Sequence, residues 1–191
     1  MNFNPVYVNC VLLSDDFENI VFLHKTSGPS FLLNKYNYVG GKQEPGENTL
    51  ASIHREVKEE AGILVDQSLF FSVTYKEFER DGKFYKLENF GAIVPKTTLS
   101  KAYTAEKEEI FCRNIKDVLM NVLTNPQDFN DDFKEILKNA LNAVPEDKRN
   151  RNHENLMFFV SERERKFSFI SKIKESQLKE DLKHTASKSK P

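Results

Sequence analysis

The stretch from Gly41 to Ile63 reads GKQEPGENTLASIHREVKEEAGI, and it predicts a loop that leads into a helix. Its first half contains Gly46 next to a proline, a pair that favours a tight turn. In its second half, apolar residues recur at helical spacing, at Leu50, Ile53, Val57 and Ala61. This spacing predicts a helix over residues 50–61 with one arc facing the core. Gly62 is well placed to end that helix in the left-handed conformation.

Three glutamates occupy a second arc of the same helix. Glu56, Glu59 and Glu60 are spaced i, i+3 and i+4, so they share one face and repel each other. Such a charged face, taken alone, is most often only solvated. A hard divalent cation removes the repulsion, because Mg²⁺ takes carboxylate oxygens and keeps waters that act as nucleophiles or bridge to phosphate. The dipeptide Gly40–Gly41 lets the backbone approach a metal or phosphates closely.

The spacing of this stretch resembles the Nudix box, G-x5-E-x7-R-E-U-x-E-E-x-G-U with U aliphatic, at every constrained position. The matching residues are Gly41, Glu47, Arg55, Glu56, Val57, Glu59, Glu60, Gly62 and Ile63. Ordinary residue usage gives such a match by chance at about 10⁻¹⁰ per starting position. The resemblance implies an α/β fold, the Nudix-type α/β/α sandwich with a central mixed sheet and a loop–helix–loop catalytic motif. It is specific over residues 40–63, is looser over residues 5–144, and does not extend to residues 145–191.

The resemblance also implies roles for individual residues. In MutT-like members, the glutamate pair and the glycine carbonyl before the box bind the metal, which implies Glu59, Glu60 and Gly40 as ligands here. The box arginine orients the neighbouring glutamate, which implies that Arg55 positions Glu56. Glu56 is then either a further metal ligand or the general base, because family members differ on this point. The implied cofactor is Mg²⁺, for which Mn²⁺ substitutes.

Other residues of the expected site have supporting roles or carry two interpretations. The resemblance implies that Glu47 and Gly62 support the motif structurally and that Gly41 contacts substrate. Lys25 ends an expected strand, where a basic residue meets substrate phosphate in the family. An exposed lysine at a strand end explains Lys25 equally well.

Acidic and aromatic residues outside the box give weaker candidates. The family often supplies a further acidic metal ligand from a loop well after the box, and here Glu106 is preferred over the neighbouring Glu108 and Glu109. A solvated acidic turn is at least as good an account of each of these three. Three aromatic residues precede the box, and core packing is preferred to base stacking for each of them: Phe31, Tyr36 and Tyr38.

The rest of the chain predicts strands on both sides of the central helix. Alternating or β-branched apolar runs predict strands over residues 6–13, 20–24, 69–79, 84–94 and 110–113, with a turn at Asp81–Gly82. Helical spacing predicts further helices over residues 115–122 and 133–144.

The bulk composition excludes several classes of protein. The 191 residues have a net charge of −1 and are 39% hydrophobic, which is typical of a globular domain without a global attraction to nucleic acid. A run of about 18 apolar residues is missing, so we expect no transmembrane helix, and the first residues do not resemble a signal peptide. Cys10 and Cys112 are too few for a disulfide scaffold. A cytoplasmic location with reduced thiols is expected.

A change in charge near Pro145 indicates a second region. Residues 1–145 carry 16 basic and 21 acidic residues, whereas residues 146–191 carry 12 and 8. We therefore expect a Nudix domain over 1–145 and a basic extension over 146–191, with a disordered end from residue 185. Basic residues among phenylalanines sometimes bind nucleic acid. The apolar run 156–160 instead favours packing on the same domain or on a partner subunit, as in a homodimer.

The absence of secondary family signatures narrows the expected substrate. ADP-ribose pyrophosphatases tend to carry a proline where this chain has Phe78–Glu79, and the diadenosine type carries a tyrosine near Arg80–Gly82. The NADH signature SQPWPxS is also missing. The lack of these signatures favours hydrolysis of a (d)NTP or modified NTP to NMP and pyrophosphate. The alternatives are a dinucleotide, ADP-ribose-like or signalling nucleotide as substrate, or a non-catalytic nucleotide sensor, which usually loses box carboxylates that this chain keeps.

Overall fold

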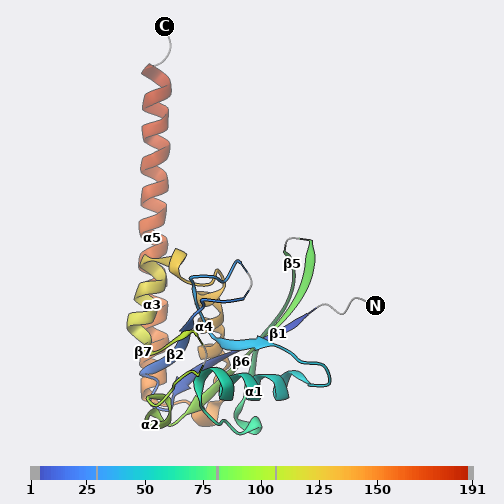
Figure 1. Ribbon diagram of the computed structural model, residues 1–191. Coiled ribbons are helices and arrows are strands. Elements are labelled where there is room, and N and C mark those ends of the chain that lie inside the picture. The colour runs from blue at the N-terminus through green and yellow to red at the C-terminus, as the bar shows by residue number, and fades with distance from the viewer. Residues whose placement is uncertain (1–4, 29, 81, 106, 189–191) are drawn as a thin grey trace. The chain divides into compact units, whose positions relative to one another are not determined.

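Figure 1 shows the computed structural model of the chain, which describes residues 5–28, 30–80, 82–105 and 107–188. For residue 80 and residues 173–188 only the backbone is described. The contacts divide the chain into two compact units, Met1–Leu156 and Met157–Pro191.

Seven strands form one mixed sheet in the first unit. They are β1 (Val6–Ser14), β2 (Asn19–His24), β3 (Tyr36–Asn37), β4 (Val39–Lys42), β5 (Phe71–Arg80), β6 (Lys83–Val94) and β7 (Glu109–Asn114). The main path runs β3-β2-β1-β6-β5, while β4 pairs with β1 and β7 pairs with β2. β1 and β6 run parallel and the other strand pairs are antiparallel, which confirms the predicted mixed sheet.

Helices cover both faces of this sheet. They are α1 (Thr49–Ala61), α2 (Lys96–Leu99), α3 (Ile115–Thr124), α4 (Phe133–Ala143) and the start of α5 (Arg151–Lys188). On one face, Val8 and Leu12 of β1 join Ile53 and Val57 of α1 in a single buried cluster. The other face carries α4, whose Phe133 lies edge-on to Phe22 and stacks on Tyr38 at 4.2 Å between ring centroids. The α/β/α sandwich is therefore confirmed.

The residues buried by α1 differ from the predicted arc. Ile53, Val57 and Ala61 are fully buried as expected, but the prediction for Leu50 was wrong, because its side chain is 38% exposed in the first turn of the helix. Two of the glutamates are buried beside the apolar arc, Glu56 and Glu60. They fit there because β4 presents glycines to this part of the helix, as described below.

The sequence-based prediction lacks β3, β4, α2 and α5. β3 and β4 are short, and the glycines of β4 mask its strand character, which comes from backbone pairing with β1. The helix α5 replaces an extension whose structure the sequence left open. The predicted hairpin of β5 and β6 is present, although its turn residue Asp81 lies outside the described residues.

The first turns of α5 belong to the first unit. His153 is buried, with its Nε2 2.8 Å from the carbonyl oxygen of Leu141, and its ring lies edge-on to Phe17 at 4.9 Å. The Asn150 side chain also donates to the Asp15 carbonyl at 3.0 Å. The division between the units thus falls after residue 156, while the domain boundary at 145 stays a prediction.

The second unit, from Met157 onward, is the remainder of α5. Its side chains include an Arg163 guanidinium 5.0 Å above the Phe159 ring and exposed Phe158 and Phe169. Disorder was expected from residue 185 onward. Residues 185–188 form the end of α5, which reaches Lys188, and residues 189–191 lie outside the described residues. In the described part of the chain, none of the helices is long and apolar enough to cross a membrane.

Candidate active site

Both ends of α1 are held in place by local interactions. Asn48 caps the N-terminus, where its side-chain oxygen accepts from the Ala51 N–H at 2.8 Å. At the C-terminus Gly62 has φ of 64°, a left-handed conformation that favours glycine. A Cβ at Gly62 would also lie 2.4 Å from the Tyr103 ring. The glycine therefore ends the helix and leaves room for the chain that returns over it.

Arg55 joins the loop of the motif to the glutamate face of α1. Its Nε and Nη2 donate to the two carboxylate oxygens of Glu47 at 2.8 and 3.1 Å. Its Nη1 donates to Glu56 at 2.8 Å and to Glu59 at 2.9 Å, and Nη2 also reaches the Lys42 carbonyl at 3.1 Å. One planar guanidinium thus fixes three carboxylates and the end of β4.

The Glu56 carboxylate lies tightly against the backbone of β4. A Cβ on Gly41 would lie 2.5 Å from both carboxylate oxygens of Glu56, so only glycine leaves room for this group. Burial raises the pKa of Glu56, although the hydrogen bond and charge of Arg55 act in the opposite direction. Glu59, on the same face, keeps its side chain 50% exposed.

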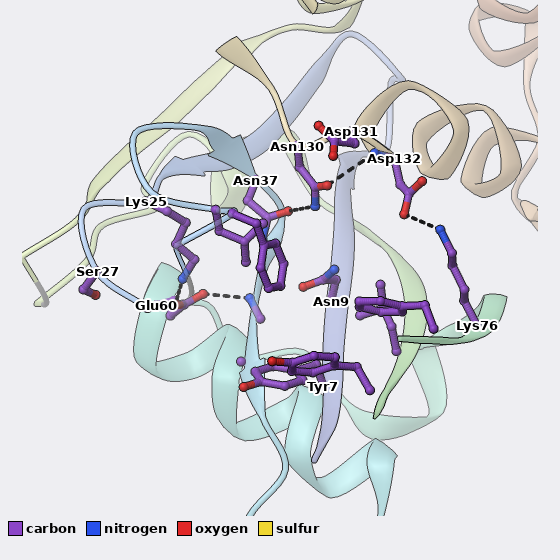
Figure 2. A pocket seen from close by; sticks show the side chains of 18 of the residues that line it. Tyr7, Asn9, Lys25, Ser27, Asn37, Glu60, Lys76, Asn130, Asp131 and Asp132 are labelled. Carbon is purple, nitrogen blue, oxygen red and sulfur yellow. Dashed lines mark hydrogen bonds and ion pairs between the residues drawn. The ribbon is translucent and has the colours of Figure 1, made fainter. Parts of the chain in front are cut away.

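A second cationic side chain, that of Lys25, lies between two buried carboxylates, those of Glu60 and Glu108. The Lys25 Nζ lies 2.5 Å from Glu60 Oε1, an ion pair that Figure 2 shows. The same Nζ lies 2.9 Å from Glu108 Oε2. The other oxygen of Glu60 accepts from the Gly40 N–H at 2.7 Å, and the Ser27 hydroxyl donates to Glu108 at 3.2 Å. Burial raises the pKa of Glu60 to about 7 against the opposing effects of Lys25 and the Gly40 N–H.

The structure therefore brings together some of the expected site residues in an unexpected arrangement. Lys25 is buried, so its interpretation as an exposed strand-end lysine was wrong. Burial lowers the pKa of Lys25, but its ion pairs with Glu60 and Glu108 together have the larger effect. The pKa of Lys25 is therefore raised above its ordinary value. Glu108 is the acidic residue that reaches Lys25, whereas Glu109 belongs to exposed positions of β7 and the preferred Glu106 lies outside the described residues.

The carboxylates form two cation-centred groups rather than one open cluster. Arg55 binds one group and Lys25 binds the other, as the distances above show. Within the described ranges, three or more Asp, Glu, His or Cys side chains are nowhere grouped as a preformed metal site. A divalent cation at this face therefore has to compete with nitrogen atoms that already pair with the oxygens.

A cavity of about 490 Å³ extends from the Lys25–Glu60 pair along the sheet. Its far end is aromatic: Phe78 and Tyr85 stack at 5.3 Å, and Tyr7 and Phe31 lie 6.0 and 6.2 Å from the Tyr85 ring. The remaining polar lining includes three amides and two acids that Figure 2 labels, namely Asn9, Asn37, Asn130, Asp131 and Asp132. Ser27, Lys76 and Glu79 also line the cavity. Two of these amides are linked, because Asn130 donates to Asn37 at 2.9 Å.

Most residues that line this cavity carry no signal in the sequence that places them in a site. Phe31 lines it rather than packing in the core, whereas Tyr38 is fully buried as predicted. Phe78 and Tyr85 lie opposite each other in the register of β5 and β6, a pairing that the predicted hairpin would have indicated. The amides carried no local signal, since Asn37 and Asn130 meet only through the fold.

The Glu47–Arg55 pair leads to a prediction about stability and pH. The hydrogen bonds from Arg55 lower the pKa of Glu47 to about 2 from its ordinary value of 4.5. A carboxylate with a lowered pKa stabilises the fold above pH 4.5, and this stabilisation is lost as the pH falls from about 4.5 to 2. We expect the difference in melting temperature between wild type and Glu47→Gln to shrink over this range, by a modest amount because solvent screens the pair. A difference that stays constant with pH would contradict the ion pair.

Comparisons with solved structures show which proteins have this fold. A MutT protein from Methanosarcina mazei Go1 is 21% identical, with a TM-score of 0.51 over 70% of this chain and 93% of that chain. A C. elegans Ap4A hydrolase is 15% identical, with a TM-score of 0.52 over 71% and 93%. A bifunctional NMN adenylyltransferase/ADP ribose pyrophosphatase from Francisella tularensis is 16% identical with a TM-score of 0.55. The alignment covers 72% of this chain but only 41% of that longer protein.

A family model provides the stronger comparison. A search of curated proteins finds no significant match. The model of the NUDIX domain, however, matches residues 4–111, which is more than half of the chain. The matched region includes the whole box, the Arg55 group, and Lys25, Glu60 and Glu108. The chain therefore belongs to the Nudix family and is a Nudix pyrophosphohydrolase.

Proposed function

We propose that this protein hydrolyses a nucleoside triphosphate, or a modified one, to the monophosphate and pyrophosphate with Mg²⁺ as cofactor. One observation carries the proposal: a single cavity joins the buried carboxylates of Glu60 and Glu108 to an aromatic end formed by Tyr7, Phe31, Phe78 and Tyr85. A site for phosphates and a site for a base thus face the same enclosed space. The main alternative is a dinucleotide, ADP-ribose-like or signalling nucleotide as substrate.

The donor set fits a hard divalent cation. Carboxylate oxygens of Glu56, Glu59, Glu60 and Glu108 lie on or beside one helix face, and oxygen ligands are those that Mg²⁺ and Mn²⁺ prefer. Together with Glu47 these are five negative charges, and Lys25 and Arg55 supply two positive ones, which leaves a net charge of about −3. When bound, the cation supplies a water of lowered pKa and neutralises phosphate charge.

We assign the following roles to the chain's own residues. Glu59, Glu60 and the carbonyl of Gly40 would hold the cation, with Glu108 in place of the expected Glu106 as the loop carboxylate. Glu56 accepts a proton from the attacking water or adds a ligand, and burial, which raises its pKa, makes it a stronger base than an exposed glutamate.

Arg55 orients Glu56 and Glu59 through the hydrogen bonds given above. Lys25 and the backbone at Gly41 line the cavity where the substrate phosphates would lie. The Lys25 ammonium attracts the negative oxygens of a phosphate. Gly41 has no side chain that would keep a phosphate away from its backbone.

The aromatic end is proposed to hold the base. Phe78 and Tyr85 already stack on each other, and Tyr7 and Phe31 complete a wall on which a flat ring can lie. A volume of about 490 Å³ suits one nucleoside better than two. The Francisella tularensis protein, of which 41% aligns with this chain, is described as a complex with AMP and a Mn ion, which are ligands of the two kinds proposed here.

Phe78→Ala tests the proposed base site. Loss of one stacking ring is expected to raise KM for the preferred nucleotide about 10- to 100-fold, with kcat within a few fold of wild type. The matched control is Phe84→Ala on the same hairpin, because Phe84 is exposed and does not line the cavity. Equal effects of the two changes would place the base elsewhere.

The reaction itself is tested by a product screen. Wild-type protein with Mg²⁺ is offered dNTPs, oxidised dNTPs, ADP-ribose, NADH and dinucleotide polyphosphates, and we expect the highest kcat/KM for a triphosphate that yields pyrophosphate. A single turnover in H₂¹⁸O should place the label in one product, because water attacks phosphorus directly. A trapped phosphoenzyme would overturn direct attack. Tight binding of all candidates without turnover would contradict the proposed hydrolysis.

A further inference from the structure

We propose that the Lys25 ammonium is an internal counter-cation of the metal site, which a divalent cation displaces from Glu60 so that it becomes available to substrate phosphate. This inference rests on the proposed function, since it assumes that Glu60 binds metal. The observation behind it is the position of Lys25 Nζ, 2.5 Å from Glu60 and 2.9 Å from Glu108.

The two carboxylates require a cation between them. The side chains of Glu60 and Glu108 are only 5% and 3% exposed, and that of Lys25 is 11% exposed. Buried carboxylates this close repel each other strongly, because water screens them poorly. Lys25 removes that repulsion and stabilises the protein before metal binds.

Both oxygens of Glu60 already have a partner, and a metal bound to this carboxylate would lie close to those partners and repel a charged one. The Gly40 N–H is fixed, because Gly40 pairs with Asn9 in the β4–β1 ladder. The backbone of Lys25 is also fixed: its N–H donates to the Lys35 carbonyl at 3.0 Å and its carbonyl accepts from the Asn34 N–H at 2.8 Å. The Lys25 ammonium, however, is attached through a flexible stem of four carbons. The exchangeable partner is therefore the ammonium.

The cavity offers space for the displaced ammonium. Lys25 lines the cavity together with Gly41 and Ser27, on the side where the carboxylates meet the open space. Rotation of its side chain away from Glu60 carries the positive charge into that space. Metal binding would then create the phosphate site, so that a nucleotide binds better after the cation than before it.

The first test measures Mn²⁺ binding to the full chain without nucleotide, by electron paramagnetic resonance of free Mn²⁺. Lys25→Met has no ammonium to displace and is expected to bind Mn²⁺ about tenfold more tightly than wild type. Lys35→Met is the matched control, because Lys35 pairs with Asp131 at 2.8 Å and does not contact Glu60. It should bind Mn²⁺ as wild type does. Equal affinity of Lys25→Met and wild type would overturn the proposal.

A second measurement uses the wild-type protein and does not depend on the folding of a variant. A buried, ion-paired ammonium gives a slowly exchanging ¹⁵N–¹H signal in protein labelled at lysine, and Lys25→Arg identifies it by its loss. Addition of Mg²⁺ should shift or remove this signal. A signal that persists unchanged at saturating Mg²⁺ would show that Lys25 stays on Glu60. Wild-type protein that binds no Mn²⁺ at all would instead contradict the proposed metal site itself.

Discussion

Glu60→Gln is expected to lower kcat by at least about 10³-fold in a protein that remains folded. The Glu60 carboxylate is the group to which Gly40 and Lys25 both donate, at 2.7 and 2.5 Å. An amide of the same shape keeps one acceptor oxygen but removes the charge that a divalent cation needs. Burial already raises the pKa of Glu60, and Lys25 keeps its ion pair with Glu108, so the protein with the neutral side chain should remain folded.

The measurement compares kcat, Mg²⁺ dependence and melting temperature of the variant with wild type. Glu77→Gln is the control, because Glu77 lies on the exposed part of β5 and pairs with Lys86. It should leave kcat unchanged. An excess of EDTA should abolish wild-type activity. Full turnover in EDTA, or a kcat of Glu60→Gln within tenfold of wild type, would show that the reaction does not need a metal ion bound at Glu60.

Arg55→Lys is expected to lower kcat about 100-fold with a smaller change in KM. The guanidinium makes five hydrogen bonds to Glu47, Glu56, Glu59 and the Lys42 carbonyl. A lysine ammonium is a compact group that cannot reach all of these acceptors at once, although it keeps the charge. Glu56 and Glu59 then lose their fixed orientation, and the reacting groups are held less accurately.

A pH profile separates this positioning role from a loss of fold. Arg55 opposes the effect of burial on Glu56, so its replacement by methionine should raise the pKa of Glu56 further. A general base works in its deprotonated form, so the acidic limb of the pH–rate profile should move to higher pH in Arg55→Met. Arg55→Lys, which keeps the positive charge, should show the lower kcat with less movement of that limb. An unmoved limb in both variants would mean that Glu56 is not the base.

Local periodicity was sufficient for the helix that carries the site. The spacing of Ile53, Val57 and Ala61 predicted α1, and Gly62 was correctly expected to end it. These features depend on residues a few positions apart, and their physical basis is the 3.6-residue turn and the left-handed freedom of glycine. The family spacing of residues 41–63 carried the identification for the same reason, since all its residues lie within one loop and one helix.

The arrangement of charges was decided by the tertiary structure. Lys25 meets Glu60 across 35 positions of sequence and Glu108 across 83, so no local pattern indicated that one ammonium serves both. The sequence placed the three glutamates on one face of the helix without indicating which are buried. Glu56 and Glu60 are buried because the glycines of β4 leave space against the helix. Which carboxylate is buried depends on what packs against it, and that partner is set by strand pairing between distant segments.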